Sequence, residues 1–376
     1  MRLVLNKTIV VLLAVLGGAL ARRRGLLDAA SCSTLSRLVV DVTFPALAVA
    51  QELRGRGWEI SWLGTADSFE SRNVPKYGFP LDTIDAYRLR GQGRGGLLLA
   101  PFRLLKAMGQ ARKVLARRRP DVVLGLGGFA TGPGGLVSKF MGLPLVIHEQ
   151  NTIPGLTNRW LARLATRVLE AFPGSFPDST GARVTGNPVR EEIAALPEPG
   201  LRMAEHDGPV RVLIVGGSLG ALALNEIVPK ALALLTAEHA LEIRHQAGRN
   251  KVGAAQGLYG DLGLQAQVTE FLDDMASAYS WADLVICRAG ALTVSELAAA
   301  GVGSILVPYP FAVDDHQTRN ADYLVQGQAA VLMPQAQLDA DSLADKLTEL
   351  LAEPGKLLAL AQAARKLAMP DAARLV

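Results

Sequence analysis

The sequence predicts an α/β protein built from two Rossmann-like domains, each a doubly wound parallel sheet. Three observations lead to this fold class. Short strands rich in Val, Ile and Leu alternate with helical segments, 376 residues suffice for two domains, and a hydrophobic content of 49% allows large buried cores. Residues 121–150 and 283–310 also share one pattern of strand, glycine turn, helix and strand. Since parallel sheets bind ligands at the carboxyl ends of their strands, we expect a ligand cleft between the domains.

The expected strands are short apolar runs. They are residues 58–65, 121–128, 144–150 and 167–172 in the first half, and 210–217, 242–248, 267–272, 283–290 and 304–310 in the second. Helical periodicity separates them, for example in residues 101–119 and 293–301. Another helix is expected around residues 45–55, because Thr43 can cap it and Pro45 fits its first turn. The segment from Pro197 to Pro209 is rich in proline and charge, so it is the natural linker.

Charge is distributed unevenly along the chain. Residues 1–190 carry 26 Lys and Arg against 12 Asp and Glu, whereas residues 191–376 carry 13 against 23. A basic first half favours an anionic partner such as lipid, nucleic acid or a phosphorylated substrate, although composition leaves a solvated basic face equally open. The cysteines, Cys32 and Cys287, indicate no disulfide framework or metal cluster, so we expect a reducing compartment.

The first 43 residues differ in character from the rest. Residues 8–21 form an apolar run of 14 residues, flanked by Lys7 and by Arg22–Arg24. A membrane-spanning helix needs about 20 apolar residues, so this run is short for one. Three interpretations stay open: a membrane-seeking helix, a buried core helix and a signal peptide. The arginines directly after the apparent cleavage site argue against the signal peptide.

Two glycine-rich segments each follow a strand and precede a helix. Residues 125–135 contain six glycines, which favours a phosphate-binding loop over a simple tight turn. Residues 216–221 (GGSLGA) do not match the G-x-G-x-x-G fingerprint, so a nicotinamide-dependent oxidoreductase is not expected. Ser218 and the neighbouring N–H groups can instead hold a nucleotide diphosphate, with an ordinary structural turn as the alternative.

Polar side chains gather after two predicted strands. The groups are residues 148–151 (His-Glu-Gln-Asn) and 314–317 (Asp-Asp-His-Gln), and polar loops after apolar strands are candidate sites. One histidine beside two adjacent aspartates lacks metal-ligand spacing. Thr293 and Glu296 fit a capping box, which the local pattern favours. The alternative is that Glu296 accepts both hydroxyls of a ribose.

A leucine-rich and basic stretch occupies residues 94–113. This composition suits an anionic membrane surface, and a core-facing helix with a basic outer face is an equally compatible alternative. The residues of the expected membrane patch are Leu97, Leu98, Leu99, Phe102, Arg103, Leu105 and Lys106.

Together these motifs resemble the MurG family, the glycosyltransferases that complete lipid II in bacterial cell-wall synthesis. In order from Phe44, the motifs are FPALAVAQELRGRG, GLGGFATGPGG, IHEQNTIPGLTN, GNPVR, GGSLGA, DDMASAYSWADLVICRAGALTVSELAAAG and VDDHQTRNA. The resemblance implies the glycosyltransferase-B fold. It implies inverting transfer of N-acetylglucosamine from UDP-N-acetylglucosamine to lipid I (undecaprenyl-pyrophosphoryl-MurNAc-pentapeptide), without a metal cofactor or a nucleic-acid partner. It also implies a peripheral position on the cytoplasmic face of the inner membrane.

The resemblance assigns residues to each substrate. UDP-N-acetylglucosamine is expected to bind at Asn151, Arg190, Ser218, Leu272, Ala291, Leu292, Thr293, Val294, Ser295, Glu296 and Gln317. Glu296 takes the ribose in this assignment, so the resemblance outweighs the capping box. The acceptor diphosphate is expected at Gly127, Gly128 and Phe129.

The resemblance also implies domain limits. Residues 44–190 are the expected acceptor- and membrane-binding domain, and residues 191–362 the UDP-sugar-binding domain. Residues 363–376 are the start of a helix that returns to the first domain and is cut short. Residues 1–43 stand apart as a foreign apolar and basic segment, which inserts in lipid, rebuilds a first strand or stays loose.

One departure from the family affects catalysis. In the family, a first strand and a loop reading G-G-T-G-G-H precede the FPALAVA helix; the loop contributes to the acceptor diphosphate site, and its histidine is a candidate base. Here Asp41-Val42-Thr43 stands at that place, and residues 1–43 resemble the amino end of auxin-efflux-carrier-type permeases, which indicates a fusion. An inverting transfer needs a base, and a diphosphate needs N–H donors. We therefore expect an intact donor site, impaired transfer and no assignable catalytic base; the alternative is a non-catalytic, membrane-associated UDP-sugar-binding protein.

Overall fold

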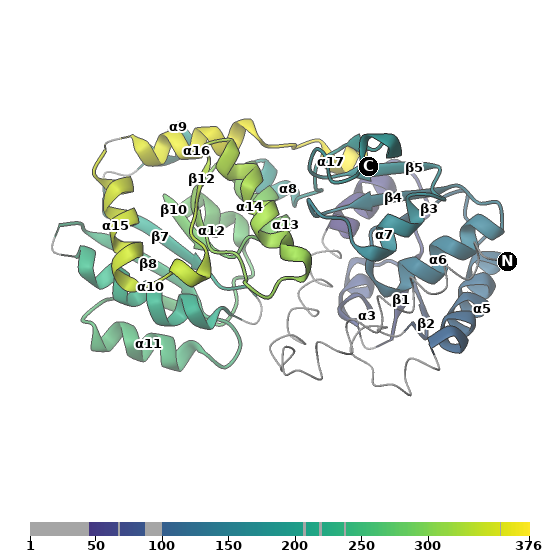
Figure 1. Cartoon of the computed structure of the whole chain (residues 1–376), viewed down its shortest axis with the longest axis horizontal. Coiled ribbons are helices and arrows are strands. Elements are labelled where there is room, and N and C mark those ends of the chain that lie inside the picture. The colour runs from purple at the N-terminus through teal and green to yellow at the C-terminus, as the bar shows by residue number, and fades with distance from the viewer. Residues whose placement is uncertain are drawn as a thin grey trace, which may run out of the picture. The chain divides into compact units, whose positions relative to one another are not determined.

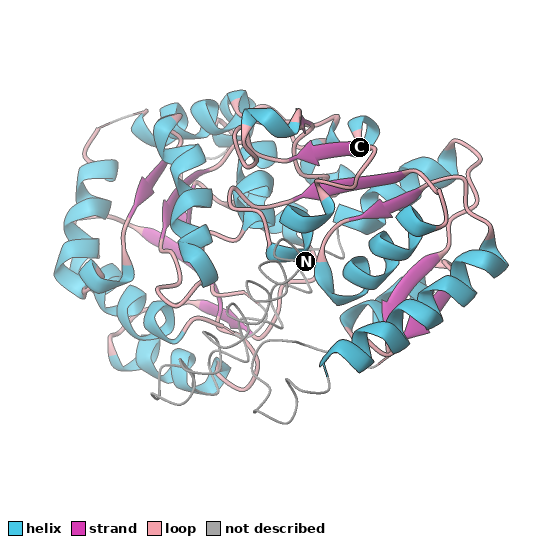
Figure 2. Cartoon of the chain, turned by 45° about the vertical axis from the view of Figure 1, so that its right-hand side comes forward, coloured by secondary structure: helices cyan, strands magenta, loops and turns pink. Residues whose placement is uncertain are grey.

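The computed structural model describes residues 45–66, 68–86, 100–205, 208–217, 220–236, 238–353 and 355–376, apart from the side chains of Phe69, Phe129 and Val313. The chain divides into two compact units, in which helices surround parallel strands (Figures 1 and 2). Unit 1 comprises the described residues up to Glu149 with Pro154–Leu169 and Phe176–Arg183. Unit 2 comprises Gln150–Ile153, Glu170–Ser175 and Val184–Val376. The foreign segment 1–43 and the leucines 97–99 lie outside the described residues.

Unit 1 contains two small sheets. The strands are β1 (Trp62–Thr65) and β2 (Leu81–Ile84), which pair in parallel, and the four-stranded sheet of β3 (Val123–Gly125), β4 (Leu145–Glu149), β5 (Arg167–Glu170) and β6 (Arg183–Val184). The helices are residues 45–55, α3 (Phe69–Asn73), η1 (Val74–Tyr77), α5 (Ala100–Arg118), α6 (Gly128–Phe140), α7 (Leu156–Leu161) and η2 (Asp178–Thr180). The helix at residues 45–55 was expected, and it buries Leu47 and Ala50 against Val74 and Phe79.

The six glycines of residues 125–135 do not form one loop. Helix α6 begins at Gly128, so Gly132, Gly134 and Gly135 lie inside it. A Cβ on Gly135 would lie 2.8 Å from Leu161 Cδ1, and a Cβ on Gly134 would lie 3.0 Å from Leu63 Cδ2. These two glycines therefore let α6 pack closely on its neighbours. Gly127 and Gly128, with φ of 90° and 80°, make the turn that starts the helix.

Unit 2 contains a six-stranded parallel sheet. Its strands are β7 (Val210–Val215), β8 (Leu241–Gln246), β9 (Gln267–Thr269), β10 (Leu284–Cys287), β11 (Gly303–Leu306) and β12 (Ala330–Leu332), in the order β12-β11-β10-β7-β8-β9. All five neighbouring pairs are parallel. Numbered from β7, this is the order 3-2-1-4-5-6 read from the far edge, which is that of a Rossmann fold.

Helices cover both faces of this sheet. The helical elements of unit 2 are α8 (Glu191–Ala194), α9 (Pro199–Met203), α10 (Leu222–Leu235), α11 (Val252–Asp261), α12 (Met275–Trp281), α13 (Ala291–Ala300), η3 (Val313–Asp315), α14 (His316–Gln326), η4 (Gln335–Gln337), α15 (Ala340–Leu351), α16 (Lys356–Lys366) and α17 (Ala372–Leu375). Along β10, Leu284 and Ile286 join one core cluster, while Val285 and Cys287 join the other. This alternation follows from the pleat of the strand, so each face has its own hydrophobic core.

All nine expected strands are present, and each is shorter than predicted. The strands β2, β6 and β12 were not predicted. The three are only two to four residues long, so their apolar runs are too short to stand out from the surrounding sequence.

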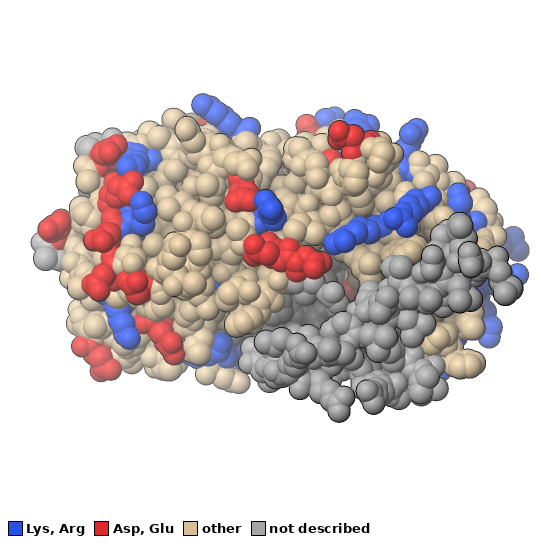
Figure 3. Space-filling model, viewed as in Figure 1, with Lys and Arg blue, Asp and Glu red and all other residues tan. Residues whose placement is uncertain are grey.

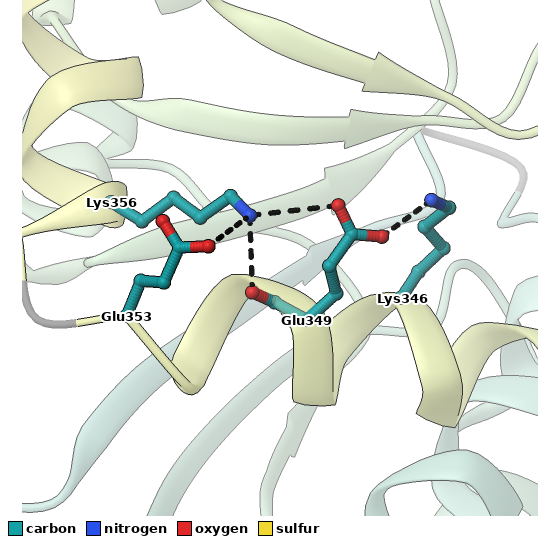
Figure 4. Close-up of polar contacts among 4 residues, drawn as sticks. All are labelled: Lys346, Glu349, Glu353 and Lys356. Atoms are coloured by element: carbon teal, nitrogen blue, oxygen red, sulfur yellow. Dashed lines mark hydrogen bonds and ion pairs between the residues drawn. The ribbon is translucent and has the colours of Figure 1, made fainter.

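The charge asymmetry of the sequence is visible on the surface. On the face shown in Figure 3, most acidic side chains lie over unit 2, and unit 1 shows mainly Lys and Arg. One surface network joins α15 to α16, where Lys356 Nζ lies 3.5 Å from Glu349 Oε1 and 3.5 Å from Glu353 Oε1 (Figure 4). Lys346 pairs with the other oxygen of Glu349. Solvent-exposed pairs of this kind contribute little stability.

Candidate functional site

The strand order of the sheet in unit 2 indicates where a ligand would bind. The chain proceeds from β7 toward β8 on one side and from β10 toward β11 on the other, so the strand order reverses between β7 and β10. Open parallel sheets bind ligands at the carboxyl ends of the strands that flank such a switch point. Gly216, Gly217 and Gly220 after β7 and the segment from Arg288 to Gly290 after β10 lie at these ends.

The turn after β7 packs backbone against backbone. A Cβ on Gly216 would lie 2.6 Å from Ala221 N, and a Cβ on Gly220 would lie 1.8 Å from Ala247 O. Gly220 also has a φ of +67°, which L side chains rarely adopt. Only glycine permits so close an approach of one backbone segment to another. Ser218, the residue expected to bind here, lies outside the described residues.

Several helices start at this edge without a side-chain cap. The N-cap residues of α10, α13 and α14 are Ala221, Gly290 and Asp315, and no side chain of theirs caps the helix. In contrast, Asp274 and Asp339 cap α12 and α15. An uncapped N-terminus presents backbone N–H groups and the positive end of the helix dipole, which favour an anion such as a phosphate.

Glu296 is buried inside α13, where it accepts two hydrogen bonds. Arg190 Nη2 donates to Oε1 at 2.8 Å, and the Tyr279 hydroxyl donates to Oε2 at 3.2 Å. Burial raises the pKa of the Glu296 carboxyl, and the Arg190 guanidinium opposes this rise. Each carboxylate oxygen has a second lone pair, so the group retains acceptor capacity for hydroxyls.

The capping-box interpretation of Thr293 and Glu296 is wrong. Helix α13 starts at Ala291 after Gly290, so both residues lie within the helix, and neither caps it. The physical reason is the glycine: its extended backbone (φ −65°, ψ 146°) begins the helix three residues earlier than the Thr-x-x-Glu pattern predicts.

Two buried asparagines organise other predicted residues of unit 2. Asn320 Oδ1 accepts from the N–H of Thr152 at 3.0 Å, and Asn320 Nδ2 donates to Asn151 Oδ1 at 3.3 Å. Asn187 Nδ2 donates to Ser295 Oγ at 3.0 Å. The structure therefore brings Asn151 together with α14 and Ser295 together with the segment that precedes Arg190. Sequence reasoning missed Asn187, Asn320 and Tyr279, because their partners lie about 17 to 170 residues away.

The turn before α14 is tightly constrained. Asp314 and Asp315 both have left-handed backbones, with φ of 55° and 51°. Gln317, in the first turn of the helix, accepts from the N–H of Tyr309 at 2.9 Å. Two successive residues in this region carry backbone strain, and such strain is concentrated at functional sites. Among the residues described, no group of three or more His, Cys, Asp or Glu could hold a metal ion.

The remaining predicted residues of the donor group divide by burial. Ala291, Leu292 and Val294 are buried, so of these residues the backbone is what can meet a ligand. Thr293 is half-buried in the first turn of α13, and Leu272 is half-buried after β9.

In unit 1, the predicted residues occupy the start of α6. Gly127 is the N-cap and Gly128 is the first residue. Glycine has no side chain, so the helix starts without a side-chain cap. Phe129 follows within the helix, and its side chain is outside the description. Glu149, at the end of β4, has a structural role: its Oε2 accepts from Gly155 N–H at 3.0 Å and from Asn158 Nδ2 at 2.9 Å.

The described part of the expected membrane patch lies at the start of α5. Phe102 and Leu105 are 70% and 64% exposed, whereas Ala107 and Ala111 of the same helix face the core. Lys106 pairs with Asp85 at 2.8 Å, which holds its amine beside unit 1. In the described part of the chain, no helix has the length and apolar character to cross a membrane.

Comparison with known proteins gives the family. The glycosyltransferase family 28 N-terminal domain matches residues 42–170, and the C-terminal domain of the same family matches residues 211–376. The relatives named UDP-N-acetylglucosamine--N-acetylmuramyl-(pentapeptide) pyrophosphoryl-undecaprenol N-acetylglucosamine transferase include one from Marinobacter nauticus, 54% identical over 88% of this chain and 91% of the relative. Another, from Aeromonas hydrophila, is 56% identical over 89% of this chain and 91% of the relative.

Solved structures agree with the sequence relatives. MurG from Acinetobacter baumannii is similar with a TM-score of 0.77 and 43% identity, over 88% of this chain and 93% of that one. A UDP-N-acetylglucosamine 2-epimerase from Listeria monocytogenes shares the fold alone, with a TM-score of 0.60 and 16% identity. The chain has the glycosyltransferase-B fold, and it belongs to the MurG family of glycosyltransferases.

Proposed function

We propose that this chain transfers N-acetylglucosamine from UDP-N-acetylglucosamine to lipid I, which forms lipid II in peptidoglycan synthesis. The observation that carries the proposal is identity above 50% to transferases named for this reaction, over almost nine-tenths of the chain. In the reaction, an acceptor hydroxyl attacks the anomeric carbon from the face opposite UDP. The bond from that carbon to the diphosphate oxygen breaks, UDP leaves, and the hydroxyl proton passes to a base.

Unit 2 is the proposed donor half. The uncapped start of α13 at the switch point would face the diphosphate, because N–H groups and the helix dipole favour its charge. Glu296, with acceptor capacity left beside Arg190 and Tyr279, would accept the ribose hydroxyls. Asn151 and Gln317, which Asn320 and Tyr309 hold in place, would contact the sugar-nucleotide. We propose that transfer needs no metal ion, so chelation by EDTA should leave it unchanged.

Unit 1 is the proposed acceptor half, and we propose that it is impaired. The turn at Gly127 and Gly128 offers N–H groups to the acceptor diphosphate. Before residue 44, however, Asp41-Val42-Thr43 replaces the G-G-T-G-G-H loop expected there, so N–H donors and a candidate base are lost. Asp41 would be a poor substitute, because its charge repels a diphosphate. General acid–base catalysis commonly contributes 10²–10⁴-fold to a rate, which sets the scale of the expected loss.

We further propose that the protein works peripherally at the cytoplasmic face of the bacterial inner membrane. The exposed Phe102 and Leu105, with Arg103 between them, support contact with an anionic surface. Such contact would bring the enzyme to its lipid-linked acceptor.

The test measures binding and transfer on the same full-length preparation. Calorimetry with UDP reports on the donor half, and labelled N-acetylglucosamine with a lipid I analogue reports on transfer. We expect UDP to bind and transfer to run at least about 100-fold slower than in the Marinobacter nauticus relative, given the scale above. Glu296→Ala should abolish UDP binding, whereas Glu349→Ala on the surface of α15 should not.

Each other result has a distinct meaning. Transfer near the rate of the relative would contradict the impaired acceptor half. UDP binding without detectable transfer would favour a membrane-associated UDP-sugar-binding protein. Absence of UDP binding in the folded chain would contradict the donor assignment itself.

A further inference from the structure

The side chain of Gln246 joins two turns that are far apart in the sequence. Gln246 is the last residue of β8 and is 3% exposed. Its Oε1 accepts from Gly217 N–H at 2.8 Å, and its Nε2 donates to Gly217 O at 2.9 Å. The same Nε2 donates to Glu270 O at 2.9 Å. One amide group therefore binds the turn after β7 and the turn after β9 at once.

This arrangement uses both hydrogens of the amide group. A primary amide has two N–H donors and one carbonyl oxygen, and here each donor has its own backbone carbonyl while the oxygen has a backbone N–H. A carboxylate has no donor for the two carbonyls, and an apolar side chain has neither group. The site is therefore specific for glutamine among side chains of this length.

The position of Gln246 follows from the sheet. β8 lies between β7 and β9, and Gln246 is aligned with Val215 at the end of β7. Its backbone carbonyl also accepts from Gly216 N–H at 3.2 Å. The preceding residue, His245, bonds to Asn225 and Tyr259 instead, so it takes no part in joining the two turns.

We propose that Gln246 is a positioning residue for the donor nucleotide. It holds the glycine turn after β7 at a fixed spacing from the turn that leads through Glu270 to Leu272. The inference rests on the proposed function and on two expectations: that the uncapped start of α10, into which the first turn leads, meets the diphosphate, and that Leu272 meets the nucleotide. A ligand that spans both turns depends on their spacing, whereas a ligand that meets one turn does not.

Two variants separate this role from simple packing. Gln246→Glu keeps the shape and replaces the donor nitrogen with an oxygen that faces two carbonyls. Gln246→Met keeps the length and removes all three hydrogen bonds. We expect the dissociation constant for UDP to rise about 10- to 100-fold in both, because a misplaced turn loses charge-assisted hydrogen bonds to the diphosphate. Uridine lacks the diphosphate, so its dissociation constant should change by less than about threefold.

The matched controls are Gln256→Glu and Gln256→Met. Gln256 is exposed on α11, and its amide makes one long bond of 3.4 Å to Ala266 O. These variants should leave UDP and uridine binding within about twofold of the parent. They would show that replacing a glutamine by Glu or Met does not by itself change affinity.

Hydrogen exchange of the ligand-free protein gives an independent readout. Amides at Gly217 and in the turn around Glu270 should exchange faster in both Gln246 variants and not in the Gln256 variants. Faster exchange at both turns with a selective loss of UDP affinity supports the proposal. Unchanged exchange, or an equal loss of UDP and uridine affinity, would overturn it. If the parent chain binds no UDP, the proposed function fails. Hydrogen exchange then still tests the Gln246 link by itself, because unchanged exchange in the Gln246 variants would overturn it without any ligand.

Discussion

The two glycine-rich segments of this protein resemble each other in sequence, but their glycines are needed for different reasons. In the turn after β7 of unit 2, a Cβ on Gly220 would collide with a backbone carbonyl, that of Ala247. In the segment after β3 of unit 1, a Cβ on Gly135 would meet only the ends of side chains, those of Leu161 and Leu145. Gly128, at the start of the same helix, has open space around a Cβ and a φ of +80°.

The difference teaches what a glycine count can and cannot indicate. Where the obstructing atom belongs to the backbone, as at Gly220, two backbone segments pack directly on each other. Where the obstructing atom belongs to a side chain, the glycine permits one element to pack on another. Three of the six glycines in unit 1 lie inside α6, so the number of glycines alone overstates the length of a phosphate-binding turn.

Substitution of the backbone-facing glycine should have the largest effect. Gly220→Ala must adopt a positive φ and move Ala247, so we expect a loss of about 3 kcal/mol or more in the free energy of unfolding, with loss of UDP binding. Urea denaturation and calorimetry measure the two effects. Gly128→Ala is the matched control: it pays the positive φ without a collision, so about 1 kcal/mol is expected. Equal losses in the two variants would mean that contact with Ala247 is unimportant.

Acidification should lower the free energy of unfolding by an amount similar to that of Gly220→Ala, because it acts on groups that support the turn after β7. Burial lowers the pKa of His245 to about 4 from an ordinary value of 6.5. His245 bonds to Asn225, which in turn donates to Ala247 O, so the histidine supports the residue on which Gly220 rests. The unfolded chain takes up the proton near pH 6.5 and the native chain only near pH 4. Stability is therefore full above pH 6.5 and falls by about 3 kcal/mol as the pH drops to 4.

The variant that tests this prediction is His245→Gln. It removes the titrating group, so the free energy of unfolding should depend less on pH between 7 and 4, by about the same 3 kcal/mol. Urea denaturation at a series of pH values measures the slope. An unchanged slope in the variant would show that other groups cause the acid loss.

The smallest effect is expected at the packing glycine of unit 1. Gly135→Ala gains about 1 kcal/mol of helix propensity and displaces the end of Leu161, so the net change in stability should stay within about 1 kcal/mol. Affinity for UDP should not change, because unit 1 is not the proposed donor half. A loss of UDP affinity, measured by calorimetry, would break the contrast between the two turns.

Much of the fold could be predicted from sequence, because its signals are local. The nine expected strands are apolar runs between turns. The helix at residues 45–55 shows its apolar periodicity and its terminal glycine directly in the sequence. The start of α13 could not be predicted in the same way. Its capping-box pattern is local and strong, yet Gly290 begins the helix before that pattern, as the turn after β10 requires.

Sequence motifs named the candidate donor residues, but they did not indicate the residues that hold them in place. Glu296 and Gln317 come from motifs, while their partners Tyr279 and the N–H of Tyr309 depend on which elements meet in space. Gln246 shows the limit most clearly. Its sequence context indicates only the end of a strand, and its role follows from having β7 on one side and β9 on the other.

The central claim is that the donor half is intact and that transfer is limited by what stands before residue 44. The most direct test replaces residues 1–43 with a first strand and G-G-T-G-G-H loop of the kind expected of the family, and compares transfer to a lipid I analogue before and after. We expect transfer to rise at least about 100-fold, because a base and N–H donors are restored, with the dissociation constant for UDP unchanged. Equal transfer rates in the two proteins would contradict the claim.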